Sequence, residues 1–208
     1  MTNRPGRWYH YGMDLLVATR NAGKLREISE VLCLPGLRLL SLADFPGIPV
    51  AEETGRTFAE NALLKARVAA YHTGLPALAD DSGLEVEALG GRPGVLSARY
   101  SSPDAGDQSN IEKLLREMAD VPDGRRKARF VCRAALAHQG RAYEAGGELE
   151  GVIVREPRGG GGFGYDPVFL LPDRGLTLAE LEPGEKNRLS HRAQALRKLG
   201  PMIRLLVK

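Results

Sequence analysis

Apolar and polar positions divide the first half of the chain into strands and helices in turn. The run DLLVAT at 14–19 is short, largely apolar and partly β-branched, which predicts a buried strand. From Asn21 onward, apolar side chains recur every three or four residues, and Asn21 is suited to cap such a helix. A second strand is predicted at 37–42. Thr57 and Glu60 then form a capping box at the start of a longer helix, TFAENALLKARVAAYHT.

The second half of the chain reads mainly as strands. A short strand at 77–79 runs into the polar stretch DDSG, which taken alone is typical of a turn. The later predicted elements are, in chain order, an extended segment at 84–89, a helix at 107–118, long strands at 127–138 and 141–154, a short strand at 167–171, and a final helix that Ser190 caps and Pro201 kinks or breaks.

This order of elements predicts an α/β fold with a mixed β-sheet and flanking helices. The 208 residues are enough for one substantial domain or for two closely joined lobes. Residues 1–12 are polar and follow neither a strand nor a helix pattern. We expect them to form a disordered tail, or to precede the true start of the protein at Met13.

The charge balance does not require a nucleic acid or a membrane as partner, since the net charge is only +3 with a pI near 8.9. No apolar run approaches the length of a membrane span, and the N-terminus lacks the apolar centre of a secretory signal. We therefore expect a cytoplasmic protein. Its cysteines, Cys33 and Cys132, both lie among apolar residues and are expected to be buried, reduced thiols.

The stretch REPRGGGGFGYDPVFL contains the glycine spacing of a dinucleotide-binding turn at 159–164. Such a turn needs a helix directly after it, whereas Gly164 is followed by a strand pattern. The dinucleotide interpretation therefore fails. The segment is either a flexible connection or, because Phe163, Tyr165 and Asp166 are unusual in a linker, part of a pocket for a base.

Asn21-Ala22-Gly23-Lys24 lies between a predicted strand and a predicted helix. Backbone N–H groups at a helix N-terminus bind phosphate, and Lys24 would add a positive charge. This is not a Walker A motif, because its first glycine is absent and Leu25 stands where Ser or Thr is required. A capped surface helix with a solvated lysine is an equally good interpretation of these residues alone.

Two acidic pairs, Glu52-Glu53 and Asp80-Asp81, are candidate ligands for Mg²⁺, which takes one or two carboxylates together with substrate phosphates. Adjacent carboxylates repel each other unless a cation or a donor lies nearby. If Asp80 and Asp81 belong to a strand, they point to opposite faces, so we expect one of them to face a site. The alternative is an acidic turn without a ligand.

Lys186 and the cluster Ser190-His191-Arg192 lie before and at the start of the last predicted helix. Positive charge is unfavourable at a helix N-terminus, so an anion is expected nearby. The alternative is a charged helix end in solvent.

Taken in order, these stretches resemble the inosine/xanthosine triphosphate pyrophosphatases, which remove aberrant purine nucleotides. Five blocks across residues 13–206 carry the resemblance: LLVATRNAGKLREI, AEETGRTFAENALLKA, ALADDSGLEVEALGGRPGVLSARY, GGGGFGYDPVF and EKNRLSHRAQAL. It implies an elongated fold with an active-site cleft between two lobes, so that 13–208 form one two-lobed catalytic domain, usually in a homodimer. It also implies hydrolysis of ITP, dITP or XTP to the monophosphate and pyrophosphate with Mg²⁺, by water attack on the α-phosphorus.

The resemblance implies roles for single residues as well. Those implied to bind the phosphates are Thr19, Asn21, Gly23, Lys24 and Lys65. Asp81 is the implied general base and a Mg²⁺ ligand together with Glu52, and Ser82 contacts substrate beside it. The implied base-binding residues are Phe163, Gly164, Tyr165 and Asp166, with Lys186, His191 and Arg192 reading the purine 6-oxo edge and holding the nucleotide. Arg20 departs from the glycine that many members have there, which leaves the geometry of this turn open.

Two other interpretations stay open. One is the same fold acting on another modified nucleoside triphosphate, for example that of a pyrimidine. The other is a nucleotide- or RNA-binding module without catalysis that uses the arginine-rich surface. Glu52, Asp80 and Asp81 disfavour the binding module, because carboxylates near phosphate do not help a protein that only binds anions.

Overall fold

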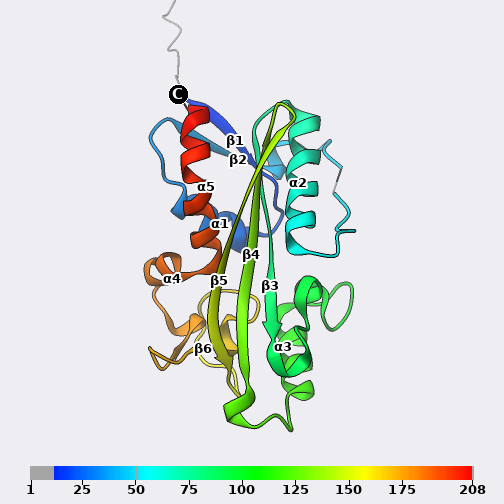
Figure 1. Ribbon diagram of the computed structural model, residues 1–208, viewed down its shortest axis with the longest axis vertical. Coiled ribbons are helices and arrows are strands. Elements are labelled where there is room, and N and C mark those ends of the chain that lie inside the picture. Colours follow the sequence, from blue (N-terminus) through cyan, green and yellow to red (C-terminus); the bar gives the residue numbers. More distant parts are fainter. Residues whose placement is uncertain (1–11, 50, 208) are drawn as a thin grey trace, which may run out of the picture.

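The structure is a computed structural model that describes residues 12–49 and 51–207 (Figure 1). Apart from Gly12, the predicted tail at 1–12 lies outside the described residues. Among the helices of the described part, none is both long enough and apolar enough to cross a bilayer.

The central sheet is built from seven strands: β1 (Met13–Val17), β2 (Leu37–Ser41), β3 (Ala77–Val86), β4 (Lys127–His138), β5 (Arg141–Ile153), β6 (Phe169–Leu171) and β7 (Leu176–Thr177). They lie in the order β2-β1-β3-β4-β5-β6-β7. β1 is parallel to β2 and β3, and the later pairs are antiparallel. The prediction of an α/β fold with a mixed sheet is confirmed.

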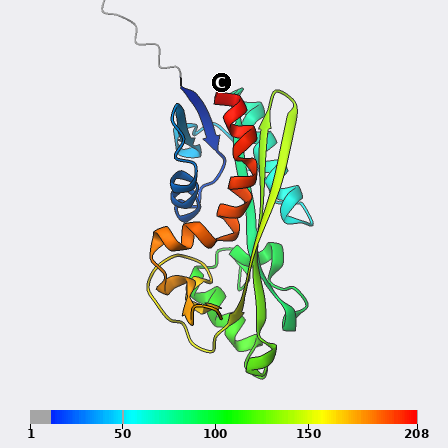
Figure 2. The same cartoon turned by 60° about the vertical axis from the view of Figure 1, so that its left-hand side comes forward.

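The helices that flank this sheet are α1 (Ala22–Val31), α2 (Phe58–Thr73), α3 (Asp107–Glu117), α4 (Pro183–Leu189) and α5 (His191–Val207). α1 and α5 lie on one side of the upper part of the sheet and α2 on the other, as Figures 1 and 2 show. β4 and β5 run along most of the elongated molecule. The part with β1, β2, α1, α2 and α5 is referred to below as the upper half, and the part with α3, β6 and β7 as the lower half.

Three apolar cores hold these layers together. One lies between the sheet and helices α1 and α5, around Ile28 and Leu196. The core under α2 consists largely of alanines, such as Ala66 and Ala79, whose small side chains let this helix pack close to β3. The third core fills the lower half around Phe169. The region where the upper and lower cores meet carries the polar residues described below.

β3 is the main departure from the sequence prediction. The stretch DDSG, predicted as a turn, lies within one continuous ten-residue strand. The pairing of β3 with β4 is unbroken from Ala77 opposite Ala137 to Val86 opposite Ala128. The turn prediction is wrong because this long ladder outweighs the local preference of four residues.

The C-terminal elements also differ from the prediction. α4 was not predicted, and α5 does not break at Pro201 but continues to Val207. Pro201 is exposed, so water can replace the hydrogen bond that its missing N–H leaves unmade. Asp166–Val168 forms a 3₁₀ turn, so only the end of the strand predicted at 167–171 is extended.

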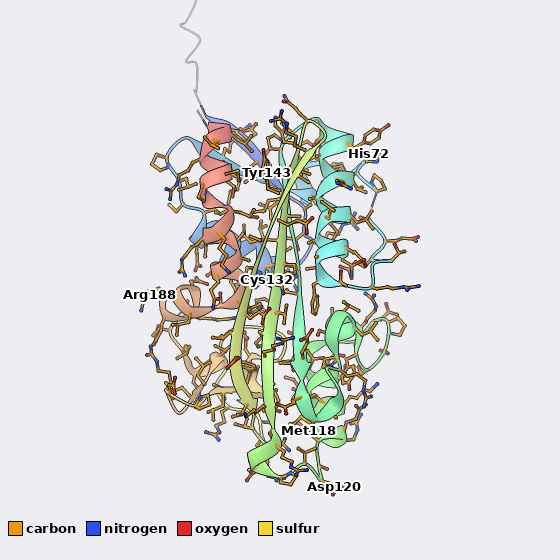
Figure 3. The ribbon with its side chains drawn as sticks, in the orientation of Figure 1. His72, Met118, Asp120, Cys132, Tyr143 and Arg188 are labelled. Carbon is orange, nitrogen blue, oxygen red and sulfur yellow. The ribbon has the colours of Figure 1, made fainter. Side chains whose placement is uncertain are left out.

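The two cysteines lie in different environments. Cys132 is buried halfway along β4, as predicted (Figure 3), whereas Cys33 is exposed. Cys33 follows Leu32, the last residue of the buried face of α1, and lies in the connection to β2. The prediction that both thiols are buried is therefore wrong for Cys33.

Candidate functional site

Asp80 and Asp81 face opposite sides of the sheet because they are neighbours in β3. On the α2 side, Asp81 accepts hydrogen bonds from Lys65 Nζ at 2.7 Å and from Asn61 Nδ2 at 3.1 Å. Lys65 and Asn61 are one helical turn apart on α2, so both reach the same carboxylate. Burial raises the pKa of Asp81, and the charge of Lys65 offsets this only in part. Burial opposes the charge of Lys65, but the surrounding carboxylates raise its pKa and keep it protonated.

On the other side of the sheet, Asp80 lies between two cations. Its Oδ2 is 3.1 Å from Lys24 Nζ and 3.2 Å from Arg192 Nε. Burial alone would raise the pKa of Asp80, but Lys24 and Arg192 lower it below its usual range. Ser82 Oγ donates to Asp80 and accepts from Arg192 Nη2. Asp80 therefore holds the lysine of the first turn next to the arginine of α5.

Buried charges continue from Arg192 toward the glycine-rich loop. Arg192 Nη1 contacts Glu27 on α1, and Glu27 is 2.7 Å from Lys186 Nζ on α4. Lys186 in turn contacts Asp166. Lys186 precedes the start of the last helix, α5, as predicted, but it lies within α4, a short helix that was not predicted. The anions expected near Lys186 and Arg192 are carboxylates of the protein itself.

The turn after β1 has the geometry of a helix cap. Asn21 Oδ1 accepts from Lys24 N at 2.9 Å, and Thr19 Oγ1 accepts from Asn21 N at 3.2 Å. Gly23, in the first turn of α1, lies directly against the ring of Phe163. A Cβ atom on Gly23 would be only 2.7 Å from a ring carbon. Glycine is required here by the close approach of Phe163, which comes from the lower half.

The loop that carries Phe163 is folded around Asp166. Phe163 N donates to Asp166 Oδ2 at 2.8 Å, and Gly164 N donates to Asp107 Oδ2 at 2.6 Å. Gly162 has a φ of 72°, and a Cβ atom there would overlap the Asp166 carboxylate. The glycines thus allow the loop to wrap closely around a carboxylate, and hydrogen bonds fix the loop at two points.

The Phe163 ring lies beside two cations. Lys186 Nζ is 4.7 Å and Arg192 Cζ 5.6 Å from the ring centre. Both distances are within the range of cation–π attraction. Tyr165 differs from Phe163, because it is packed in the lower core and its hydroxyl donates to Ser97 O at 2.9 Å. Of the two aromatic rings, Phe163 is the one placed to stack on a ligand.

His191 is the first residue of α5, and its ring is stacked on Phe130 with 4.8 Å between the ring centres. Burial, assisted by the charge of Arg192, lowers the pKa of His191 well below 6.5, so the ring is neutral. Its Nδ1 is buried and has no hydrogen-bond partner among the described residues. Buried polar atoms nearly always have a hydrogen-bond partner, so we infer that a ligand supplies the partner of this nitrogen.

Two adjoining cavities contain these side chains. The smaller, of about 90 Å³, is lined by Phe163, Tyr165, His191 and Arg192 among others. The larger, of about 560 Å³, is lined by Thr19, Lys65 and the acidic pair Glu52-Glu53 among others. Asn21, Lys24 and Ala98 line both cavities. The cavities therefore meet beside the helix cap of α1.

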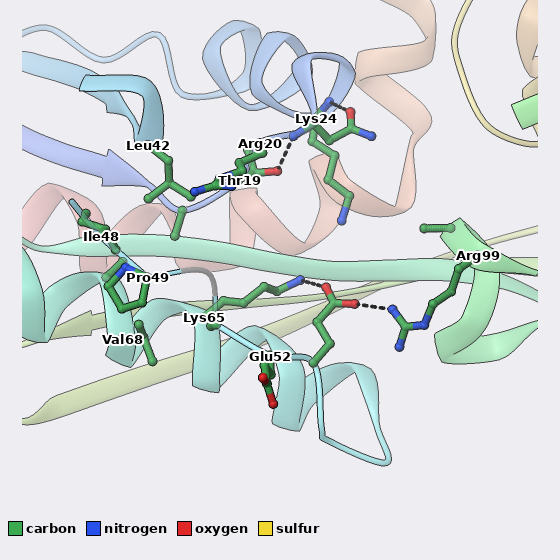
Figure 4. A pocket seen from close by; sticks show the side chains of 16 residues that line it. Thr19, Arg20, Lys24, Leu42, Ile48, Pro49, Glu52, Lys65, Val68 and Arg99 are labelled. Atoms are coloured by element: carbon green, nitrogen blue, oxygen red, sulfur yellow. Dashed lines mark hydrogen bonds and ion pairs between the residues drawn. The ribbon is translucent and has the colours of Figure 1, made fainter. Parts of the chain in front are cut away.

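Cations and carboxylates face each other in the larger cavity (Figure 4). Glu53 accepts from Lys65 Nζ and from Arg99 Nη1, each at 3.0 Å. Burial would raise the pKa of Glu53, but Lys65 and Arg99 lower it overall. Glu52 is exposed, and in Figure 4 its carboxylate is directed away from the Lys65 ammonium. Of the two glutamates, Glu53 makes the contacts within the site.

The carboxylates available to a metal form a pair and not a closed cage. In residues 12–49 and 51–207, no group of three or more His, Cys, Asp or Glu side chains is placed to hold a metal ion. Asp81 and Glu53 nevertheless share one cation, Lys65 Nζ, at 2.7 and 3.0 Å. Two carboxylates around one positive charge fit Mg²⁺, provided that substrate phosphates supply further ligands.

The residues predicted from the sequence come together in this region. All of them line one of the two cavities except Gly23, which contacts Phe163, and Asp81, which contacts Lys65. Sequence reasoning missed Glu27, Asn61 and Arg99. Glu27 follows Lys24 by three residues and Asn61 precedes Lys65 by four, so helical spacing could have found the first two. Arg99 has no such pattern.

Comparisons with known proteins confirm the resemblance. The model of the Ham1 family matches residues 15–202. The dITP/XTP pyrophosphatase of Geobacillus kaustophilus is 55% identical over 189 residues, which cover 89% of this chain and 92% of that protein. The dITP/XTP pyrophosphatase of Escherichia coli K12 is 53% identical over 190 residues, covering 89% and 95%. The solved structure of a HAM1 protein from Coxiella burnetii matches with a TM-score of 0.84 and 44% identity, covering 93% of this chain and 99% of that one.

We expect the His191 imidazole to stay neutral as the pH falls through 6.5, the ordinary pKa of histidine, because burial disfavours its charged form. Nitrogen NMR of the ring during a pH titration measures this directly. In the unfolded chain the ring has its ordinary pKa near 6.5 and binds a proton more readily. Protonation of His191 in the unfolded chain therefore lowers the stability of the folded protein as the pH falls below about 6.5. A midpoint for His191 at or above pH 6.5 would show that the ring is charged when folded and contradict this assignment.

Proposed function

The chain belongs to the Ham1 family, and on that premise we propose that it hydrolyses the non-standard purine nucleoside triphosphates ITP, dITP and XTP to the monophosphate and pyrophosphate. One observation carries the proposal: a cavity walled by Phe163, His191 and Arg192 adjoins, beside a helix cap and Lys24, a larger cavity lined by Lys65 and Glu53. The first cavity suits a base and the second a chain of phosphates.

Base selection rests on buried polar groups that have no partner among the described residues. His191 Nδ1 is one of them, and it donates in one of the two neutral tautomers of the ring. Arg192 has five N–H groups, of which three donate to Asp80, Glu27 and Ser82. Inosine and xanthine present a 6-oxo acceptor to such donors, whereas adenine presents an amino group. Adenine would leave buried donors unpaired, which is a costly mismatch.

The phosphates bind at the start of α1. The N–H groups of the first helical turn have no partners inside the helix and favour a negative charge. Lys24 and Lys65 add positive charge on either side of β3. Fixed charges of this kind stabilise the charge that develops on phosphate oxygens as the bond to the leaving group breaks.

Asp81 is the proposed general base. Burial raises its pKa, which makes it a better proton acceptor than an ordinary aspartate once it is ionised. A water molecule attacks the α-phosphorus and its proton passes to Asp81. The bond from the α-phosphorus to the bridging oxygen breaks, and that oxygen leaves with its electron pair as part of pyrophosphate.

Mg²⁺ is the proposed cofactor. Asp81 would hold it together with a carboxylate of the pair Glu52-Glu53, and the contact of Glu53 with Lys65 favours Glu53 over Glu52. When bound, the ion would neutralise phosphate charge and polarise the phosphorus–oxygen bonds. Lys65 would then exchange its carboxylate partners for phosphate oxygens.

The homodimer and the cytoplasmic location expected from the sequence are part of this proposal, as is the absence of a nucleic-acid partner. Sedimentation of the purified protein at several concentrations tests the dimer. A particle with the mass of a single chain at all concentrations would exclude it.

Turnover measurements test the proposed function. With MgCl₂ present, we expect IMP and pyrophosphate from ITP, the matching products from dITP and XTP, and little turnover of ATP or GTP. Product analysis by ion-exchange chromatography distinguishes the alternatives. Orthophosphate as the first product would exclude attack on the α-phosphorus. Selective turnover of dUTP would indicate a pyrimidine substrate, and tight binding without turnover a binding module.

Asp81→Asn should lower kcat about 10²- to 10⁴-fold, the usual contribution of a general base. The amide keeps the shape of the side chain, and Lys65 keeps Glu53 as a partner, so the variant should fold. Asp123→Asn is the matched control, since Asp123 is an exposed partner of Arg155 outside both cavities. Turnover of Asp81→Asn within a factor of two of the wild type would remove Asp81 from the mechanism.

Gly23→Ala and Phe163→Ala should each raise KM for ITP roughly tenfold, with a smaller effect on kcat. The methyl group added in Gly23→Ala would displace the Phe163 ring, and Phe163→Ala removes the same ring. The double variant should therefore be little worse than either single variant, because both changes disrupt the same contact. Steady-state kinetics of the four proteins measure this, and fully additive effects on KM would contradict a shared cause.

A further inference from the structure

Arg99 is a cation of the larger cavity that the proposed reaction has not yet used. It ends the 3₁₀ helix Gly94–Arg99, which belongs to the lower half. The residue before it, Ala98, lines both cavities. Arg99 itself lines only the larger cavity, next to the point where the two cavities meet and opposite the upper-half residues Lys24 and Lys65 (Figure 4).

The partner of Arg99 in this structure is Glu53, at 3.0 Å from Nη1. The side chains of Arg99 and Glu53 are 36% and 29% exposed. An ion pair so open to water contributes little stability, so a stronger anion can replace Glu53 at little cost. After such an exchange, Glu53 would be free to hold the Mg²⁺ ion proposed above.

The orientation of the bound nucleotide follows from the positions of the two cavities. With the base in the smaller one, the α-phosphorus lies near Asn21 and Lys24, which line both. The two outer phosphates then lie in the larger cavity, which Arg99 faces. Lys24 is held by Asp80, and Lys65 by Asp81 and Glu53. Arg99 has one carboxylate partner and a planar fork of donors that suits two phosphate oxygens at once.

We propose that Arg99 binds the pyrophosphate leaving group, exchanging Glu53 for oxygens of the two outer phosphates. This assignment rests on the proposed function. It gives the lower half a direct contact with the leaving group, in addition to its contact with the base through Phe163. Arg99 thereby neutralises charge that accumulates on pyrophosphate when the bond to the α-phosphorus breaks.

Calorimetric titration of the whole protein with pyrophosphate in MgCl₂ buffer tests the assignment. Arg99→Ala should raise the dissociation constant of pyrophosphate about tenfold or more, the effect expected on losing hydrogen bonds to a charged group. The affinity for IMP should stay within about twofold, since IMP lacks the outer phosphates. Arg99→Lys should recover part of the loss, because it keeps the charge without the fork.

Arg38→Ala is the matched control. It removes an arginine that also pairs with a single carboxylate, Asp14, at 2.6 Å, but lies outside both cavities. It should bind both ligands as the wild type does. Arg99→Gln provides a second variant of similar length if Arg99→Ala proves unstable on thermal unfolding.

Three outcomes would overturn the assignment: unchanged pyrophosphate affinity in Arg99→Ala and Arg99→Gln, equal losses for IMP and pyrophosphate, or no pyrophosphate binding by the wild type. Equal losses would mean that Arg99 only supports the shape of the site. Because the titration requires no turnover, it is independent of the proposed reaction. A wild-type protein that binds pyrophosphate through Arg99 but does not cleave ITP would refute the proposed function, and Arg99 would then be a pyrophosphate-binding residue without a leaving-group role.

Discussion

The structure depends on burying two adjacent carboxylates in one strand. Asp80 and Asp81 can both lie in β3 because successive side chains point to opposite faces, and each carboxylate meets cations of its own there. A turn at this place would put both charges on the same exposed loop. The strand instead separates them by the thickness of the sheet and assigns one to α2 and the other to α1 and α5. In the proposed reaction the two faces have different tasks, proton transfer at Asp81 and positioning at Asp80.

The charges on the Asp80 face tie distant segments together. Lys24, Asp80, Arg192, Glu27, Lys186 and Asp166 form an alternating series from α1 and β3 through α5 and α4 to the glycine-rich loop. Breaking a buried pair by removing one partner usually costs about 3–5 kcal/mol, because the other charge stays buried. The series therefore fixes the positions of Lys24 and Arg192 more strictly than apolar packing would, and those two residues stand at the proposed phosphate and base ends of the site.

Much of this arrangement could be predicted from the sequence, since caps and periodic patterns are local. The caps at Asn21 and Thr57 and the long hairpin are confirmed. The DDSG stretch was misread because its conformation is decided by β4, some fifty residues away. Glu27 and Asn61 were missed because a polar residue in a helix is usually solvated, and burial depends on what packs against it. Arg99 faces Glu53 only through the tertiary fold, so no local pattern reveals it.

The contact between Phe163 and Gly23 connects base recognition with phosphate placement. Phe163 comes from the lower half and Gly23 from the helix cap of the upper half, and a single added carbon would separate them. In the proposed binding mode, a base that stacks on Phe163 therefore rests against the same turn whose N–H groups hold the phosphates. Binding energy from the base can then be used to place the α-phosphorus beside Asp81. A nucleotide with the wrong base would lose more than affinity in the smaller cavity, because its phosphorus would no longer be held in line with water and leaving group. Discrimination in this site is thus expected in the rate of the chemical step as well as in binding.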